Sequence, residues 1–183
     1  MWLLQIKMDI NLRQMSKNQL LLTSLLCAFA LSLGRSQEEF SEKDRLFNGR
    51  NLKNWTVTPD KENIWWSVKD GILYAKSDAE ETGSNLWSQE EYQDFLMRLE
   101  FKMGSGTVDS GVFLRGENPE SPQIQIGISG SLKVDMTGSP YVPKQGYPAK
   151  AEVENLLNVK GWNTMLIKVV KNHYEVWLNG EGA

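Results

Sequence analysis

Residues 95–103 carry apolar side chains at every second position, and this alternation constrains the fold more than any other feature. The apolar positions are Phe95, Met97, Leu99, Phe101 and Met103. Successive side chains of a strand point to opposite faces, so this stretch has one dry face and one mostly charged face. Such a strand is typical of an antiparallel sheet that covers a core on one side.

Short strand patterns separated by turn signals recur along the rest of the chain. They cover residues 55–57, 65–68, 72–75, 109–114, 123–127, 163–170 and 174–178. Aromatic and β-branched residues enrich them, and Lys69-Asp70-Gly71 is a hairpin signal. No long amphipathic helix pattern interrupts them, and 183 residues suffice for one domain with a core. The sequence therefore predicts an all-β fold, an antiparallel β-sandwich.

The N-terminal region has the pattern of a secretory signal peptide. Lys17 precedes an apolar run over residues 20–31, and Gly34 and Ser36 are the small residues that a signal peptidase reads. We expect residues 1–36 to be a signal peptide cleaved after Ser36, with the residues before Met15 reflecting a start codon assigned too early. An uncleaved anchor is the alternative, but the run is short for a membrane span. The protein is then secreted or periplasmic, with residues 37–45 as an exposed lead-in.

Charge and cysteine content exclude several classes of function. The net charge is −3 and the pI is about 5.3, so the chain lacks the basic footprint of a nucleic-acid-binding protein. Cys27 is the only cysteine and lies in the predicted signal peptide, so the mature chain has no disulfide, thiol nucleophile or thiolate metal site. No cofactor and no metal site are predicted; a divalent cation with oxygen ligands stays open but has no support in the sequence.

Two neighbouring strand patterns carry polar groups where a buried strand would not. Gln123 and Gln125 share one strand face, and Gly127 continues it without a side chain. The preceding pattern begins at Asp109 and ends at Arg115. The two together predict a polar binding face on a sheet.

Residues 129–150 form a long segment rich in Gly and Pro, and loops of this length often carry function. It holds Lys133, Asp135 and Tyr141. His173 lies in a hairpin turn, where a solvent-exposed role is expected rather than a catalytic one.

The pair Asn179-Gly180 is a strong hairpin signal close to the end of the sequence. Only residues 181–183 follow it, so we expect a returning strand to be absent. We therefore expect residues 46–183 to be a domain that is incomplete at its C-terminus.

Several short blocks in a fixed order resemble the 3-keto-disaccharide hydrolase domain family. They are residues 46–49, 66–71, 92–95, 99–102, 110–115, 161–164 and 177–180. The resemblance implies a concanavalin A-like jelly roll, with two antiparallel sheets and a sugar site on the concave face. It also implies a hydrolase that acts on the glycosidic bonds of 3-keto-glycosides. Many members of the family have acidic residues around the segment that matches Gln123 to Gly127, and this chain departs from them there.

The departure matters because ordinary glycoside hydrolysis uses two carboxyl groups. Amides and glycine cannot supply them, which leaves keto-sugar chemistry or plain binding. A ketone at C3 of a hexose acidifies the hydrogen on C2, so a base can remove it and the C1 substituent then leaves. Water adds back to complete a net hydrolysis. Such a site needs a base, a donor for the enolate oxygen and an acid for the leaving group.

The candidates divide into two groups. Those for catalysis are Asp109, Lys133 and Asp135, and those for substrate binding are Arg115, Gln123, Gln125 and Tyr141. Each has a structural alternative: a turn-forming aspartate, a solvated loop residue, a surface ion pair, an exposed polar strand or a tyrosine that pins the loop. The predicted function is an exported 3-keto-glycoside hydrolase with carbohydrate as its partner. The alternatives are a carbohydrate-binding module of the same fold and a truncated, non-functional product.

Overall fold

The structure is a computed structural model that describes residues 1–7, 11–15, 40–80, 82–116, 121–153 and 155–183. Its strands run antiparallel and belong to three sheets. A short 3₁₀ helix, η1 (Glu42–Asp44), lies between β2 and β3 in the chain. The strands of the largest sheet, apart from β2, follow the order β13-β12-β11-β7-β1-β5-β4. They are β13 (Glu181–Gly182), β12 (His173–Leu178), β11 (Asn163–Val170), β7 (Phe95–Met103), β1 (Leu3–Ile6), β5 (Ile72–Lys76) and β4 (Trp66–Lys69).

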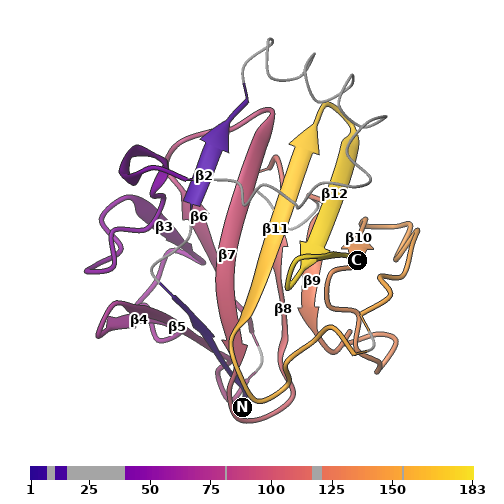
Figure 1. Ribbon diagram of the computed structural model, residues 1–183. Coiled ribbons are helices and arrows are strands. Elements are labelled where there is room, and N and C mark those ends of the chain that lie inside the picture. The colour runs from indigo at the N-terminus through magenta and orange to yellow at the C-terminus, as the bar shows by residue number, and fades with distance from the viewer. Residues whose placement is uncertain (8–10, 16–39, 81, 117–120, 154) are drawn as a thin grey trace.

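Strand β7 lies at the centre of this sheet (Figure 1). One edge pairs with β11, from Phe95↔Val169 to Phe101↔Asn163. The other edge is shared by β1 and by β2 (Asn11–Gln14). The predicted alternation is confirmed, because Phe95, Leu99 and Phe101 are buried on one face. Leu96 is also buried, although it points to the opposite side.

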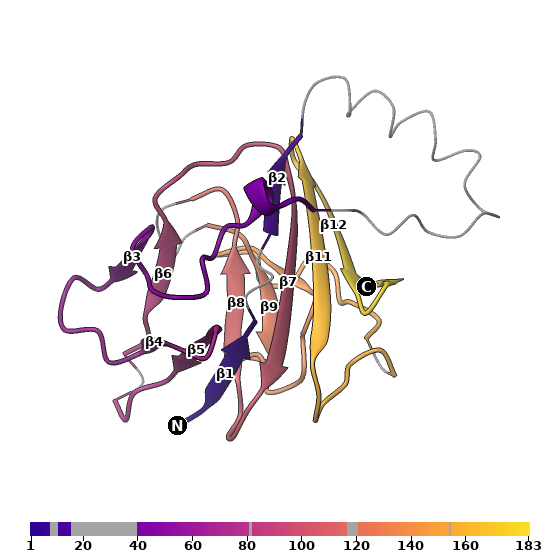
Figure 2. The ribbon, with the colours of Figure 1, turned by 60° about the vertical axis from the view of Figure 1, so that its left-hand side comes forward.

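Two smaller sheets form a second layer. One contains β10 (Pro140–Tyr141), β9 (Gln123–Gly127) and β8 (Asp109–Phe113), and the other pairs β3 (Trp55–Thr58) with β6 (Asn85–Ser88). Figure 2 shows β6, β8 and β9 facing the layer that holds β7 and β11. The core lies between the layers and joins residues of both, such as Phe101 and Ile167 with Ile124 and Ile126. The predicted all-β sandwich of antiparallel sheets is confirmed.

The turn signals work as the sequence predicts. Asp70 and Gly71 both have positive φ (52° and 78°) and connect β4 to β5 as a two-residue hairpin. Asn179 (52°) and Gly180 (91°) do the same between β12 and β13. A two-residue strand therefore does return after the second turn, whereas the sequence predicted none. That the domain continues beyond residue 183 stays a prediction.

Two strands of the structure come from the region that the sequence predicts to be a signal peptide, and the cleavage of that region stays a prediction. Strand β1 inserts between β5 and β7, and β2 extends along β7. Leu4 is 1% exposed and belongs to the core. The physical reason is that β5 and β7 each present a free edge, and a strand with apolar residues at alternate positions satisfies both. The predicted cleavage site and the apolar run over residues 20–31 lie outside the described residues.

Replacing Phe101 tests the central role of β7. Its ring is fully buried, so Phe101→Ala removes a large apolar contact and leaves a cavity. We expect a loss of about 3–5 kcal/mol in the free energy of unfolding, measured by urea denaturation. Lys102→Ala, next to it on the outward face, is the matched control and should change stability by less than about 0.5 kcal/mol. Equal effects of the two variants would contradict the assignment of the dry face.

Candidate functional site

The sheet formed by β8, β9 and β10 gathers four of the predicted site residues on one face. Cross-strand partners share a face, and the register pairs Asp109 with Gly127, Gly111 with Gln125, and Phe113 with Gln123. Tyr141 on β10 pairs with Gln123 from the other side. The opposite face carries Ile124 and Ile126, which pack into the core. Thus Asp109, Gln123, Gln125 and Tyr141 point away from the core on a common face.

Gln125 is the hub of this face. Its Nε2 donates a hydrogen bond of 2.7 Å to Oδ1 of Asp109. Its Oε1 accepts from the hydroxyl of Tyr147 at 3.1 Å and from Nε2 of Gln123 at 3.3 Å. The side chain is 1% exposed, so these partners satisfy an amide that has almost no contact with water. The bonds fix the amide with its donor end toward Asp109.

Two glycines allow backbone and side chains to approach closely around this hub. A Cβ at Gly111 would lie 2.8 Å from Oε1 of Gln123, and one at Gly130 would lie 2.5 Å from Oδ2 of Asp109. Gly111 therefore lets the Gln123 side chain cross β8, and Gly130 lets the loop pass beside the carboxylate. Oδ2 of Asp109 thus lies beside Gly130, and Asp109 is an exposed residue.

Tyr147 is a site residue that the strand patterns did not reveal. It comes from the long loop, and its ring packs against Tyr141 with centroids 5.2 Å apart. Burial raises the pKa of Tyr147, and the neighbouring Asp109 charge acts in the same direction. The hydroxyl therefore stays protonated at neutral pH and can donate. The spacing of the loop residues does not identify Tyr147 as a site residue. Its hydrogen bond to Gln125 in the structure does.

An open cleft of about 1710 Å³ extends from this face toward β6. Asp109, Gln123, Lys133 and Arg115 all line it. Aromatic rings form another part of its wall, where Trp87 on β6 meets Phe113 on β8 at 5.4 Å between ring centroids. The cleft thus combines carboxylates and amides with an aromatic wall, a composition suited to a sugar ring.

The remaining predicted residues have separate positions. Arg115 donates to Asp94 at 2.8 Å, with both side chains largely buried, so it borders the cleft while held by an ion pair. Lys133 is exposed on the loop and borders the cleft beside Asp109. Asp135 accepts bonds from the backbone amide and hydroxyl of Thr137, at 2.9 and 2.6 Å. Asp135 bridges to Ile128 just after β9 and lines a second, smaller pocket rather than the cleft.

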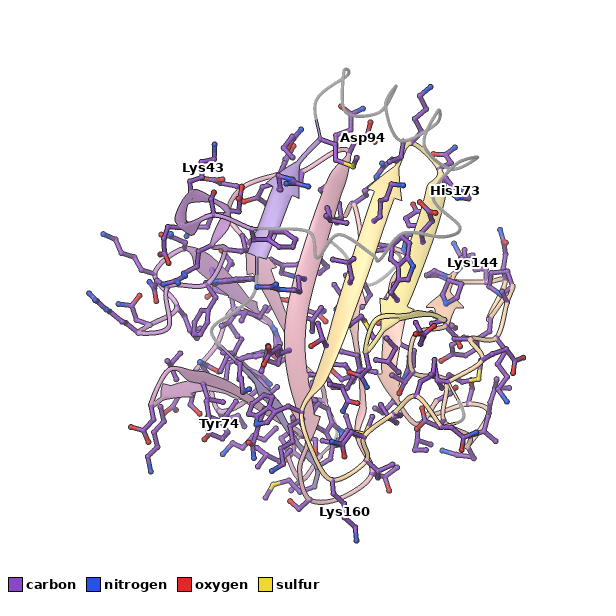
Figure 3. The ribbon with its side chains drawn as sticks, in the orientation of Figure 1. Lys43, Tyr74, Asp94, Lys144, Lys160 and His173 are labelled. Atoms are coloured by element: carbon purple, nitrogen blue, oxygen red, sulfur yellow. The ribbon has the colours of Figure 1, made fainter. Side chains whose placement is uncertain are left out.

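His173 lies at the turn between β11 and β12 and is exposed, as expected (Figure 3). The described part of the chain contains no cluster of three or more His, Cys, Asp or Glu side chains that could hold a metal ion. In the same residues, no helix is long and apolar enough to cross a membrane.

Comparison with known proteins identifies the family. A model of the 3-keto-alpha-glucoside-1,2-lyase-like domain matches residues 42–182. The chain belongs to this family. The resemblance drawn from the ordered sequence blocks is thereby confirmed, and it covers every strand except β1 and β2.

A solved structure supports the same fold. A crystal structure from Parabacteroides distasonis, described as a "putative glycosyl hydrolase", superposes with a TM-score of 0.54 at 26% sequence identity. The match covers 73% of this chain and 66% of that one. No curated protein matches the chain. The family and the crystal structure are both named for enzymes that act on glycosides, in agreement with the prediction of a hydrolase-like enzyme.

Within this lyase-like domain, the loop after β5 holds one rim of the cleft. Asp78 accepts bonds from the Thr82 hydroxyl at 2.6 Å and from the Trp65 indole at 2.5 Å. These bonds hold the pKa of Asp78 well below its usual value of 3.8. Trp65 is 3% exposed, so it is a buried anchor of this rim rather than a free sugar platform.

The Asp78 bonds predict an acid-dependent stability. Because the folded pKa is depressed, the carboxylate stabilises the fold above pH 3.8, and that contribution is lost as the pH falls toward the folded pKa. Asp78→Asn should therefore lower the melting temperature at pH 7, and its deficit should shrink toward about pH 2. Tryptophan fluorescence during heating measures this, with Asp60→Asn as an exposed control. A deficit that is unchanged at low pH would argue against the carboxylate.

Gln125→Glu tests the hub. The new carboxylate would be buried against Asp109, so its folded pKa rises above the unfolded value of about 4.3. Below that value the variant is nearly as stable as the wild type, and the penalty grows with pH to about 3 kcal/mol at neutral pH. Gln125→Met also loses the hydrogen bonds but carries no charge. Urea denaturation at pH 4 and pH 7.5 should show a pH-dependent difference between these two variants, and a constant difference would refute the geometry.

Proposed function

We propose that this domain cleaves the glycosidic bond of 3-keto-glycosides, by elimination and then hydration. The family assignment and the glycoside hydrolase neighbour support a glycoside-hydrolase-like activity, and the lyase name of the family fits the elimination step. The observation that carries the proposal is Asp109: an exposed carboxylate with one oxygen held by Gln125, on the sheet face that borders the cleft.

Asp109 is the proposed base. The C3 ketone makes the C2 hydrogen acidic, and the carboxylate takes that proton. The electron pair of the broken C2–H bond forms an enolate, with the negative charge on the oxygen at C3. As that oxygen regains its double bond to C3, a C1=C2 double bond forms and the C1–O bond breaks. The leaving oxygen keeps its bonding pair and takes up a proton. Water then adds across the double bond, with hydroxide at C1 and a proton at C2, to give the free keto sugar.

The other groups of the face supply donors. The enolate oxygen develops negative charge, and Gln123 and Lys133 both border the cleft as hydrogen-bond donors. Tyr147, whose hydroxyl donates to Gln125 at 3.1 Å, is the proposed acid for the leaving oxygen. Tyr141, packed against Tyr147, offers a ring on which a sugar can stack.

A carbohydrate-binding module is the second candidate. One observation favours it: among the described residues of this face, Asp109 is the only carboxylate, so the face lacks the pair that ordinary glycosidases use. A module would keep the amides and aromatic rings for hydroxyl and ring contacts and need no base.

We also propose that the protein is exported, to the periplasm or outside the cell. The support is in the sequence alone: Lys17, the apolar run over residues 20–31, and small residues at Gly34 and Ser36. Mass spectrometry of the protein recovered from an exporting host would give its N-terminus, and an intact N-terminus would contradict cleavage after Ser36.

Release of the leaving group from a 3-keto-α-glucoside, beside the same glucoside without the ketone, tests the enzymatic proposal. We expect turnover of the keto form only, with a transient unsaturated keto sugar seen by NMR. Asp109→Asn should reduce kcat by about 10²–10⁴-fold, because general base catalysis contributes this much. Asp70→Asn is the control, since it changes an exposed carboxylate in a turn that asparagine tolerates.

Calorimetry with the same ligands separates the two candidates. Turnover that survives in Asp109→Asn would remove Asp109 as the base. Binding of the keto sugar by a wild-type protein that never turns it over would identify the domain as a binding module. Neither binding nor turnover of any keto-glycoside would overturn both.

A further inference from the structure

Two aromatic side chains lie on the same sheet face as Asp109 and have no part in the proposed chemistry. Asp109, Gly111 and Phe113 occupy alternate positions of β8, so they face the same side of the sheet. The ring of Phe113 packs against Trp87 of β6, with 5.4 Å between the ring centroids and an angle of 40° between the planes. Figure 2 shows β6 and β8 in the same layer. Trp87 and Phe113 together are called the aromatic platform below.

The aromatic platform lies far from the proposed base along the strand. Phe113 follows Asp109 by four residues on β8, which corresponds to about 13 Å at the usual rise of a strand. A single pyranose ring is shorter than this, so a sugar whose C2 lies at Asp109 does not reach the platform. Both line one cleft of about 1710 Å³, which exceeds the ~300–1,000 Å³ that is usual for a small-molecule pocket. The cleft therefore has room for more of a substrate than the keto sugar.

An amide lies between Asp109 and the aromatic platform. Gln123 is the register partner of Phe113, and its Oε1 lies over Gly111, because a Cβ at Gly111 would be only 2.8 Å from this oxygen. The Nε2 of Gln123 donates to Gln125 at 3.3 Å, which leaves Oε1 to accept from a hydroxyl group. Along β8 the face thus presents a carboxylate, then an amide oxygen and then the aromatic platform.

Hydrogen bonds hold the aromatic platform in place and engage its one polar atom. The indole nitrogen of Trp87 donates to Thr58 Oγ1 on β3 at 3.1 Å. The Thr58 carbonyl accepts from Ser84 Oγ at 2.8 Å, and that hydroxyl accepts from the Trp66 indole at 2.9 Å. Phe113 has no polar side-chain atom, and both rings of the platform are only half-buried. The platform therefore offers ring faces to a ligand, in an arrangement that is fixed before the ligand binds.

Polar side chains border the aromatic platform. Thr56 on β3 is the register partner of Trp87, is exposed and lines the cleft, and Asn85 on β6 lines it as well. Ring faces beside hydroxyl and amide groups suit a pyranose, which has apolar C–H faces and a rim of hydroxyls. An apolar aromatic ligand would cover those polar groups without giving them partners. The surroundings of the platform therefore favour a sugar as its ligand.

We propose that the aromatic platform is a subsite for the leaving group, and that the substrates are 3-keto-glycosides whose leaving group is an oligosaccharide. This rests on the proposed function, in which the bond that breaks joins C1 of the keto sugar to the rest of the substrate. In a chain whose terminal sugar carries the ketone, everything beyond that sugar leaves with the C1 oxygen. The first sugar of the leaving group then lies at Gln123, and the second lies on Trp87 and Phe113.

The position of the aromatic platform determines which kinetic constant it affects. Contacts this far from the reacting bond are the same in the bound substrate and in the transition state, so they lower KM and leave kcat unchanged. Stacking of one sugar ring contributes about three- to tenfold in affinity. This gain should appear only when the leaving group has at least two sugars, because a shorter group does not reach Phe113.

The experiment uses the full chain and a series of 3-keto-α-glucosides whose leaving groups are methanol, glucose, maltose and maltotriose. Calorimetry on Asp109→Asn, in which turnover is slow, gives Kd, and the wild type gives KM and kcat. We expect Kd and KM to fall about three- to tenfold from the glucose to the maltose compound, at constant kcat. Trp87→Ala and Phe113→Leu, each also combined with Asp109→Asn, should abolish this step without changing Kd for the glucose compound. Trp162→Leu, which removes a half-buried indole outside the cleft, is the matched control and should keep the step.

Two results would overturn the proposal. In one, the glucose and maltose compounds have the same Kd. In the other, the step persists in Phe113→Leu and in Trp87→Ala, with cooperative melting showing that each is folded; if Trp87→Ala does not fold, Phe113→Leu decides alone. A step in Kd that depends on the platform, in a protein that turns over none of the compounds, would refute the proposed catalysis and support the subsite. The two failures are therefore distinguishable.

Discussion

The whole architecture depends on both edges of β7 being paired. Its alternation sends Leu99 and Phe101 into the core, and the register with β11 places Met165 and Ile167 beside them on the same face. A slip of one residue in this ladder would turn every one of these side chains to solvent, so burial fixes the register. The opposite edge pairs with β1 and β2, which precede the residues that the family model matches.

Most strands were predictable from sequence, but β1 and β2 were not. Strand β7 follows from its five alternating apolar positions, and Asp70-Gly71 and Asn179-Gly180 are the turn signals of the hairpins that they close. Trp2, Leu4 and Ile6 also alternate, but three positions beside the apolar run over residues 20–31 favour a leader. Their burial depends on tertiary contacts, because β1 pairs with an edge of β5 and an edge of β7.

Some residues of the candidate site were likewise predictable from sequence, and others were not. The period-two pattern of β9 already places Gln123 and Gln125 on one face, and the register with β8 adds Asp109 to it. Tyr147 and the separation of Asp135 depend on the path of the loop, which no periodicity encodes. The amide at Gln125 has a clear physical role: it donates a hydrogen bond to Asp109, which an ionised carboxylate at this position could not do. A site with one base on this face suits removal of an acidic C–H proton better than hydrolysis by paired carboxyls.

Strand β1 and the cleft are physically connected. Trp2 and Ile6 of β1 line the same cleft as Asp109, so β1 provides part of its wall. The sheet with the candidate site packs on the core through Ile124 and Ile126, and Leu4 belongs to that core. Because close-packed interiors transmit changes of packing, a substitution that loosens β1 would disturb both the wall of the cleft and the support of the sheet behind Gln125.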